Sequence, residues 1–218
     1  MNLKILYEND TLLVVEKPAG MDMETLKALL PAGALPSHRL DKDTSGILLV
    51  AKNQQTLKLL QKQFQERKVE KKYICLVAGN IKKNEGKIET LLGRAPGDRR
   101  KQKVYIRGEP GSKGKREAVS EYRVLKRFPD HTLLEVKPKT GRKHQVRAHL
   151  ASLGHPIAGD RLYGFKNQKV PASLKRQFLH ASYLRFQMPD GSTKEFHSEL
   201  PHDLIPCLQQ LKNSVNRI

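Results

Sequence analysis

The sequence twice places two runs of β-forming residues on either side of a short turn. LKILYEND and TLLVVEKPAG form the first pair, and residues 117–126 and 131–138 form the second, which meets at a Pro-Asp turn. Each pair predicts an antiparallel hairpin, with a sharp reversal of the chain as the alternative for the first pair. With 12 prolines and 15 glycines in 218 residues, the hairpins favour a loop-rich α+β fold over a helical bundle, in one main domain.

Helical periodicity is clearest after the apolar run ILLVA at residues 47–51, which predicts a buried strand. Asn53 is a suitable N-cap, and apolar residues recur at helical spacing from Leu57 to Phe64. A further helix is predicted over HQVRAHLASL, with Gly154 at its C′ position. The other predicted elements are a short helix at residues 24–30, a buried strand over KKYICLVAG, strands near 179–187 and 193–197, and a closing helix over DLIPCLQQLK.

Residues 80–116 differ in composition from the rest of the chain. They hold few large apolar residues and include the basic run GDRRKQKVYIRGEPGSKGKRE. This composition predicts a long, exposed, cationic insertion or hairpin. Its charges are either a solvated surface or a nucleic-acid contact, and both interpretations stay open.

The charge balance indicates the class of partner. The chain carries 41 Lys and Arg against 22 Asp and Glu, a formal net charge of +19, with a pI near 10.0. Such a chain binds polyanions, so we expect nucleic acid, with a general solubility role for the charge as the alternative. No apolar run approaches the roughly 20 residues of a membrane span, and the N-terminus lacks the apolar core of a signal peptide, which predicts a soluble, cytoplasmic protein.

Cofactor and metal signatures are missing from the sequence. There is no GxGxxG after a strand, no GxxxxGK[ST], no CxxC and no HExxH, so we expect no nucleotide cofactor and no tightly bound metal. His144 and His149 are separated by about 140° around a helix and do not share a face as zinc ligands would. Cys75 and Cys207 lie in apolar contexts and are predicted to be small core residues rather than a disulfide.

Three residues are candidates for chemistry, and each also has a structural interpretation. Asp41 precedes the buried strand in HRLDKDTSG, where it or Asp43 either caps the turn or holds a carboxylate at the mouth of a cleft. Arg147 lies at the border of the apolar stripe of its helix, where an arginine either snorkels to solvent or pairs with a carboxylate. Tyr73 lies in the apolar run YICLV, which is typical of a core tyrosine with one hydrogen bond.

Three strings in the chain resemble one family closely. HRLDKDTSGILLVAK, KKYICLVAG and TGRKHQVRAHLASLGHPIAGDRLYG are similar to the signature segments of the RluA-type pseudouridine synthases, in the family order, and the opening ILYENDTLLVVEKPAG is similar too. The resemblance covers residues from about 3 to about 200. It implies one catalytic domain over residues 1–218, with a mixed, largely antiparallel central sheet, flanking helices and loops, and no N-terminal RNA-binding module.

The resemblance also implies roles for single residues. Asp41 matches the catalytic aspartate, Tyr73 the tyrosine that packs on the target base, and Arg147 the arginine that pairs with the aspartate. Arg39 matches an arginine that enters the RNA when the target nucleotide leaves its stack. The reaction breaks the bond from uracil N1 to the ribose, turns the base and rejoins it through C5, so it needs no redox cofactor. Ionised Asp41 either attacks the ribose C1′ or removes the C2′ proton, and both routes stay open.

We expect the basic segments to hold the RNA backbone. Arg142 and Lys143 lie at the start of the predicted helix, where they either contact phosphates or form a solvated turn. The predicted RNA-binding residues are Arg39, Arg99, Arg100, Lys101, Lys103, Arg142, Lys143 and His144. Since residues 21–37 are shorter than in many members of the family, substrate choice is expected to rest on the catalytic domain and the loop at 95–116.

We interpret the sequence as that of an RNA pseudouridine synthase that acts as a monomer on a stem-loop of ribosomal or transfer RNA. One alternative is an RNA-binding or ribosome-assembly protein on the same fold, in which modification is incidental or lost. A second alternative is a nuclease or base-excising glycosylase, which would also direct a carboxylate at a flipped base. It would release uracil or cleave the strand, whereas a synthase leaves the mass of the RNA unchanged.

Overall fold

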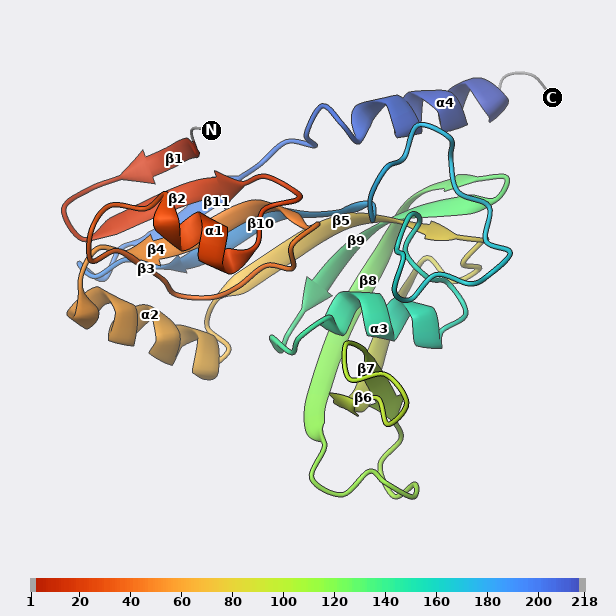
Figure 1. The fold of residues 1–218 in the computed structure, drawn as a ribbon, viewed down its shortest axis with the longest axis horizontal. Helices are drawn as coiled ribbons and strands as arrows, with labels where there is room; N and C mark the ends of the chain where they lie inside the picture. The colour runs from red at the N-terminus through yellow and green to blue at the C-terminus, as the bar shows by residue number, and fades with distance from the viewer. Residues whose placement is uncertain (1–2, 216–218) are drawn as a thin grey trace. The chain divides into compact units, whose positions relative to one another are not determined.

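The computed structural model describes residues 3–215, and the chain divides into two compact units (Figure 1). The first unit contains Met1–Lys72 and His180–Glu199, and the second contains Tyr73–Leu179 and Leu200–Ile218. Each unit has its own hydrophobic core. The single catalytic domain expected over residues 1–218 stays a prediction.

The first unit is built on a mixed sheet. Its strands are β1 (Lys4–Glu8), β2 (Leu12–Lys17), β4 (Ser45–Ala51) and β10 (Leu179–Gln187), in that order, with β11 (Thr193–His197) paired to β10 and β3 (Leu35–Pro36) paired to β4. Strands β4 and β10 are parallel, and the other pairs are antiparallel. The predicted hairpin of β1 and β2 is therefore confirmed.

Helices of the first unit begin at or within one residue of the predicted positions. In α2 (Gln54–Gln65) the side chain of Asn53 accepts a hydrogen bond from the N–H of Thr56 at 2.8 Å, and Leu60 is fully buried. Helix α2 contacts β4. The short helix α1 (Met23–Ala28) begins one residue before the predicted range, after the N-cap Asp22. The core of this unit includes Leu12, Val14, Ile47, Leu49, Leu60, Leu184 and Phe186.

The second unit is built on an antiparallel sheet. Its strand order is β5 (Glu70–Ala78), β9 (His131–Pro138), β8 (Arg116–Phe128), β6 (Glu85–Arg94) and β7 (Gln102–Tyr105). Helix α3 (Gln145–Ser152) contacts β7, β8 and β9, and α4 (Ile205–Val215) contacts β8 (Figure 1). With the mixed sheet of the first unit, this confirms the α+β class and the largely antiparallel pairing.

The end of α3 also follows the prediction. Gly154 has a φ of +83°, its N–H donates to the carbonyl of Ala151 at 3.0 Å, and the N–H of His155 donates to the carbonyl of Leu150 at 3.0 Å. These two bonds form a Schellman motif, which needs a left-handed residue at C′. Cys75 and Cys207 are free and buried in the core of the second unit, as predicted.

The segment at 80–116 is a hairpin rather than an insertion. Strands β6 and β7 pair with each other, and β6 also pairs with β8, so the segment forms part of the sheet. Ile88 is 6% exposed and Leu92 is 3% exposed. The insertion interpretation was wrong because a few well-placed apolar residues suffice when both neighbouring strands supply backbone partners. Among residues 3–215, no helix has the length and apolar character needed to cross a membrane.

Candidate active site

Asp41 lies at the start of a tight turn in the first unit. The N–H of Thr44 donates to the carbonyl oxygen of Asp41 at 3.0 Å, and strand β4 begins at the next residue. The Asp41 side chain is partly buried, whereas Lys42 and Asp43 are exposed. Gly46 follows with a φ of +121°, and a Cβ at this position would collide with the backbone of the neighbouring strand β10. The turn therefore joins a strand that is closely packed from its second residue.

A buried lysine fixes the residue next to Asp41. Lys17, at the end of β2, is 0% exposed. Its Nζ donates to the carbonyl oxygens of Pro18 at 2.8 Å, Met21 at 2.8 Å and Lys42 at 3.0 Å. The N–H of Gly20 also donates to the carbonyl of Lys42 at 3.0 Å. A buried ammonium group is costly unless it is hydrogen-bonded, so these contacts hold the Asp41 turn against the loop that follows β2.

The residues that precede Asp41 differ in burial. Leu40 is buried, Arg39 is exposed, and the ring of His38 packs 4.7 Å from the Phe64 ring, centroid to centroid. Nε2 of His38 accepts a hydrogen bond from the N–H of Leu49 at 3.1 Å, which requires a neutral imidazole. Burial, and then the charge of Lys71, lower the pKa of His38 to about 3. His38 is thus a structural residue, and Arg39 is available at the surface.

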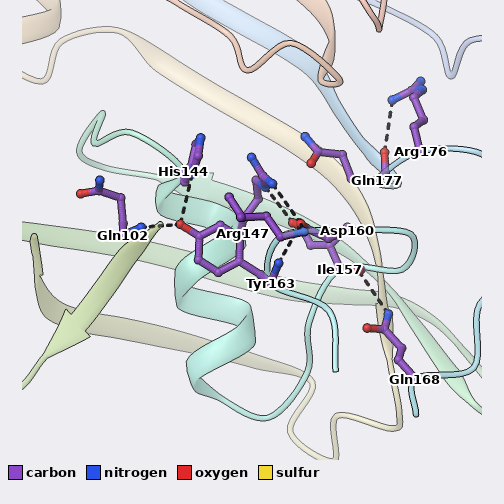
Figure 2. Close-up of polar contacts among 10 residues, drawn as sticks. Gln102, His144, Arg147, Ile157, Asp160, Tyr163, Gln168, Arg176 and Gln177 are labelled. Carbon is purple, nitrogen blue, oxygen red and sulfur yellow. Dashed lines mark hydrogen bonds and ion pairs between the residues drawn. The ribbon is translucent and has the colours of Figure 1, made fainter. Parts of the chain in front are cut away.

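Arg147 forms a buried ion pair in the second unit. Its Nε donates to Oδ2 of Asp160 at 2.7 Å and its Nη2 donates to Oδ1 at 2.9 Å (Figure 2). The Arg147 side chain is 9% exposed and that of Asp160 is 0% exposed. The snorkelling interpretation was therefore wrong. The chain that follows α3 returns to place Asp160 against Arg147, and helical periodicity carries no information about such a contact.

The environment of Asp160 keeps it ionised. Burial by itself raises the pKa of this carboxyl group, but the hydrogen bonds and charge of Arg147 more than offset burial, so the pKa lies below its ordinary value. Oδ1 also accepts the backbone N–H groups of Leu162 at 2.9 Å and Tyr163 at 3.0 Å. A carboxylate with this many donors holds the guanidinium in one orientation.

Tyr163 joins Arg147 to the basic hairpin. Its ring lies 5.1 Å from the guanidinium carbon of Arg147, in a cation–π contact. Its hydroxyl oxygen accepts the N–H of Gln102 at 2.6 Å and shares a hydrogen bond of 3.1 Å with Nδ1 of His144 (Figure 2). His144 itself has a left-handed φ of +54°. We call Arg147, Asp160, Tyr163, His144 and Gln102 the Arg147 cluster.

The Arg147 cluster brings two predicted RNA-binding segments together. Gln102 belongs to the basic run at 98–104 and His144 to the run at 142–144, and Tyr163 bonds to both. Arg99, Arg100, Lys103 and Lys143 are exposed, Lys101 is partly buried, and Nε of Arg142 donates to the carbonyl of Glu117 at 2.9 Å. Arg100 pairs with Asp98 at 2.8 Å, and this pair lowers the pKa of Asp98 to about 2.

Two further residues of the helix fix its position on the sheet. Gln145 donates from Nε2 to the carbonyl of Val119 at 2.9 Å and to Oγ of Ser120 at 3.0 Å. Nδ1 of the His149 ring shares a hydrogen bond of 3.0 Å with Oγ of Ser120, and Nε2 of His149 lies 3.0 Å from Oγ1 of Thr90. Burial lowers the pKa of His149 to about 4, so it is neutral at pH 7.

Sequence reasoning missed Lys17, Gln145, His149, Asp160 and Tyr163. All five lie inside the strings that carried the resemblance, so their presence there was the available signal.

Tyr73 is partly buried on β5 and packs against the core of the second unit, as a core tyrosine would. Among the described residues, no group of three or more His, Cys, Asp and Glu side chains is arranged to hold a metal ion.

The fold and these sequence segments define a class of protein. The sequence profile of the RNA pseudouridylate synthases matches residues 11–152, a range that includes Asp41, Tyr73 and Arg147. The chain belongs to this family, which confirms the resemblance to the RluA-type enzymes.

Several relatives agree with this assignment. A protein of Aquifex aeolicus described as an uncharacterized RNA pseudouridine synthase is 43% identical, over 91% of this chain and 70% of the relative. Ribosomal large subunit pseudouridine synthase D of Nitrosomonas europaea is 38% identical, over 97% of this chain and 66% of the relative. Ribosomal large subunit pseudouridine synthase C of Haemophilus ducreyi is 37% identical, over 95% of this chain and 69% of the relative. The chain thus spans about two thirds of the length of these relatives.

Two solved structures share the fold. Human RNA pseudouridylate synthase domain containing 1 has a TM-score of 0.83 at 30% identity, over 100% of this chain and 96% of the other. Human RNA pseudouridylate synthase domain containing 4 has a TM-score of 0.81 at 26% identity, over 96% of this chain and 93% of the other.

Proposed function

We propose that this chain converts specific uridines of structured RNA to pseudouridine, with Asp41 as the catalytic carboxylate. The observation that carries the proposal is the family match over residues 11–152, which contains Asp41, Tyr73 and Arg147. Relatives named for the ribosomal large subunit favour a stem-loop of ribosomal RNA as the substrate, with transfer RNA as the alternative. We further propose that the protein acts as a cytoplasmic monomer.

The Asp41 turn suits a residue that has to react with the ribose of the target nucleotide. A carboxylate at C1′ or C2′ has to be placed within a fraction of an ångström, and a turn fixed by backbone hydrogen bonds supplies such placement. In the reaction the N1–C1′ bond breaks, the uracil ring turns, the C5–C1′ bond forms, the C5 proton leaves and N1 gains a proton. The atoms balance without an oxidant or reductant. The nucleophilic and the glycal routes both begin with Asp41 ionised.

Arg147 is proposed to keep that carboxylate ionised. An arginine near an aspartate typically lowers its pKa by about 1–3 units. Asp41 and Arg147 belong to different units, so their pairing stays a prediction of the family resemblance. Within the second unit, Asp160 uses two of the five donors that a guanidinium carries, so serving a second carboxylate is compatible with this ion pair.

The RNA must be held firmly enough to extrude a base. Removing a nucleotide from its stack costs a few kcal/mol, which phosphate contacts have to supply. Tyr163 joins the segments at 98–104 and 142–144, and we propose that their exposed cations make these phosphate contacts. Arg39 is proposed to fill the position in the RNA stack that the target nucleotide leaves. Tyr73 is proposed to stack on the target uracil.

Asp41→Asn tests the proposal, with Asp43→Asn as its matched control. Both changes remove one carboxylate from the same turn, and Asp43 is the exposed one. Each variant is incubated with unmodified large-subunit rRNA and with total tRNA, and pseudouridine is mapped by carbodiimide adducts and primer extension. We expect the unchanged protein and Asp43→Asn to create the same new primer-extension stops, and Asp41→Asn to create none. If Asp41 forms the covalent bond to the sugar or removes its proton, the rate of pseudouridine formation should fall at least about a thousandfold.

Three other outcomes would count against the proposal. Equal stops from Asp41→Asn would remove Asp41 from the chemistry. Specific RNA binding by the unchanged protein without any new stop would favour the RNA-binding or ribosome-assembly interpretation. Released uracil or strand cleavage would indicate a glycosylase or nuclease.

A further inference from the structure

A cavity of about 700 Å³ lies in the second unit, on the segment that follows Asp160. Its volume is within the range of about 300–1,000 Å³ that is usual for ligand sites. Its lining includes Gly159, Asp160, Arg161, Phe165, Lys166 and Lys175. None of these residues except Asp160 takes part in the Arg147 cluster.

The charges in the cavity favour an anion. Arg161, Lys166 and Lys175 contribute three cations, and Asp160 is the one carboxylate among the lining residues. The charge of Asp160 is already matched by Arg147 through two hydrogen bonds. The cavity therefore presents a net positive surface.

The cavity also exposes an aromatic ring. Phe165 is 52% exposed, an unusual degree for a large apolar side chain, and Val170 beside it is 46% exposed. Aromatic faces among cations are the common features of sites for unpaired nucleotides, because bases stack on the ring while phosphates meet the cations. An acidic peptide would use the cations but would leave the ring without a flat partner.

The backbone around the ring is held in shape. Oε1 of Gln168 accepts the N–H of Phe165 at 3.3 Å. Its Nε2 donates to the carbonyl of Ile157 at 3.2 Å, a contact shown in Figure 2. The N–H of Gly164 donates to the carbonyl of Asp160 at 2.9 Å. These contacts tie both sides of the loop to the segment that carries Asp160, so the ring is presented on an organised loop.

We propose that this cavity binds an unpaired nucleotide of the RNA substrate other than the target uridine, with its base on Phe165 and its phosphates at Lys166 and Lys175. The inference rests on the proposed function, because it takes RNA as the substrate. It adds a second point of RNA selection on the segment that also orients Arg147. An RNA with an unpaired nucleotide at the right distance from the target would be preferred over a continuous duplex.

A tryptophan reporter tests occupancy directly. The chain contains no tryptophan, so Phe165→Trp introduces a single one. Titration with a short single-stranded RNA should quench its fluorescence, because a base stacks on the indole. Leu125→Trp is the control, since Leu125 is 43% exposed on β8 and does not line the cavity. No quenching, equal quenching in both variants, or equal quenching by free uridine monophosphate at the same concentration would overturn the proposal.

Binding and activity of cavity variants give the second test. Phe165→Ala should weaken binding of a stem-loop transcript by about five- to tenfold, which is the low end for loss of one stacked base. Lys166→Gln and Lys175→Gln should each lower the slope of log K against log salt concentration by about 0.7. Lys169→Gln is the matched control, because Lys169 lies in the same loop, pairs with Asp130 and does not line the cavity.

The readouts separate this proposal from the proposed function. If the unchanged protein forms no pseudouridine, the proposed function fails. If it forms pseudouridine and the Phe165, Lys166 and Lys175 variants match Lys169→Gln in affinity, salt slope and KM, the cavity does not bind the substrate and the proposal is wrong.

Discussion

The Asp41 turn and the Arg147 cluster hold their key residues in different ways. Asp41 is placed by backbone contacts: the Thr44 N–H bonds to its carbonyl, and Lys17 and Gly20 bond to the next carbonyl. Arg147 is placed by side chains, through two bonds to Asp160 and the ring of Tyr163. Backbone contacts fix the main chain of the Asp41 turn independently of the carboxylate. A residue held by side-chain contacts has a fixed charge and orientation.

This difference suits the two proposed roles. A carboxylate that reacts with a sugar must change its bonding during the reaction, whereas a guanidinium that stabilises it has to stay in place. The two regions should therefore respond differently to substitution and to pH. Three substitution and pH experiments test this contrast. Each would give a different result if backbone contacts and side-chain contacts held the Asp41 turn and the Arg147 cluster in the same way.

Asp160→Asn is expected to have the largest effect on stability. It leaves a buried guanidinium with one charged partner fewer, a change that typically costs about 3–5 kcal/mol of the free energy of unfolding. Urea unfolding followed by circular dichroism measures the loss. Asp130→Asn is the control, since its pair with Lys169 has side chains that are 51% and 76% exposed and should contribute at most about 1 kcal/mol. Equal effects of the two variants would show that the Arg147 pair is not a structural anchor.

The pH dependence should separate the regions next. The pKa of His149 falls from 6.5 in the unfolded chain to about 4 in the fold, so the unfolded state binds more protons between these values. The stability contributed by neutral His149 is complete above about pH 6.5 and decreases as pH falls to about 4, by up to about 3 kcal/mol. Hydrogen exchange of the α3 amides at several pH values measures it.

His149→Gln provides the control for this titration. It retains hydrogen-bonding groups but has no titrating ring, so the α3 amides should lose most of their pH dependence between pH 6.5 and about 4. The Thr44 amide should keep its pH dependence in the variant, because His149 belongs to the second unit and the Thr44 N–H donates to the backbone carbonyl of Asp41. An unchanged slope at α3 would exclude His149 as the cause.

Lys17→Met is expected to have the smallest effect on stability but a specific effect on activity. It keeps the length of the side chain and leaves carbonyl acceptors without the ammonium group, a loss of about 1–3 kcal/mol. Because the Lys42 carbonyl is then less firmly held, kcat for pseudouridine formation should fall more than KM rises. Lys42→Met, which changes only an exposed side chain of the same turn, is the control. A fall in stability with kcat unchanged would show that Lys17 does not position Asp41.

The local features of the fold were predictable because their causes lie within a few residues. Asn53 caps α2 through an N–H three residues away, and Gly154 ends α3 at the C′ position, which has a left-handed conformation. The hairpins follow from runs of β-forming residues on either side of a short turn. The basic hairpin at 80–116 was only half predicted, because its apolar residues are few and their burial depends on neighbouring strands.

The candidate site was predictable only as a set of residues. The strings around Asp41, Tyr73 and Arg147 identified the family, and their residue types suit the chemistry. The contacts that hold them were missed because each joins distant parts of the chain: Arg147 and Asp160 are 13 residues apart, Lys17 and Lys42 are 25 apart, and Gln102 and Tyr163 are 61 apart. Helical and strand periodicity in the sequence does not predict contacts between residues so far apart.

The sequence by itself therefore determined the class of the protein, its charge and most of its helices and strands, since these depend on composition and on neighbours along the chain. Only the tertiary structure decided that Arg147 is buried, that Asp160 is its partner, and that a lysine fixes the turn after Asp41. The physical reason is desolvation. A charged group can be buried only where folding brings it a partner, and that partner is chosen by the return path of the chain.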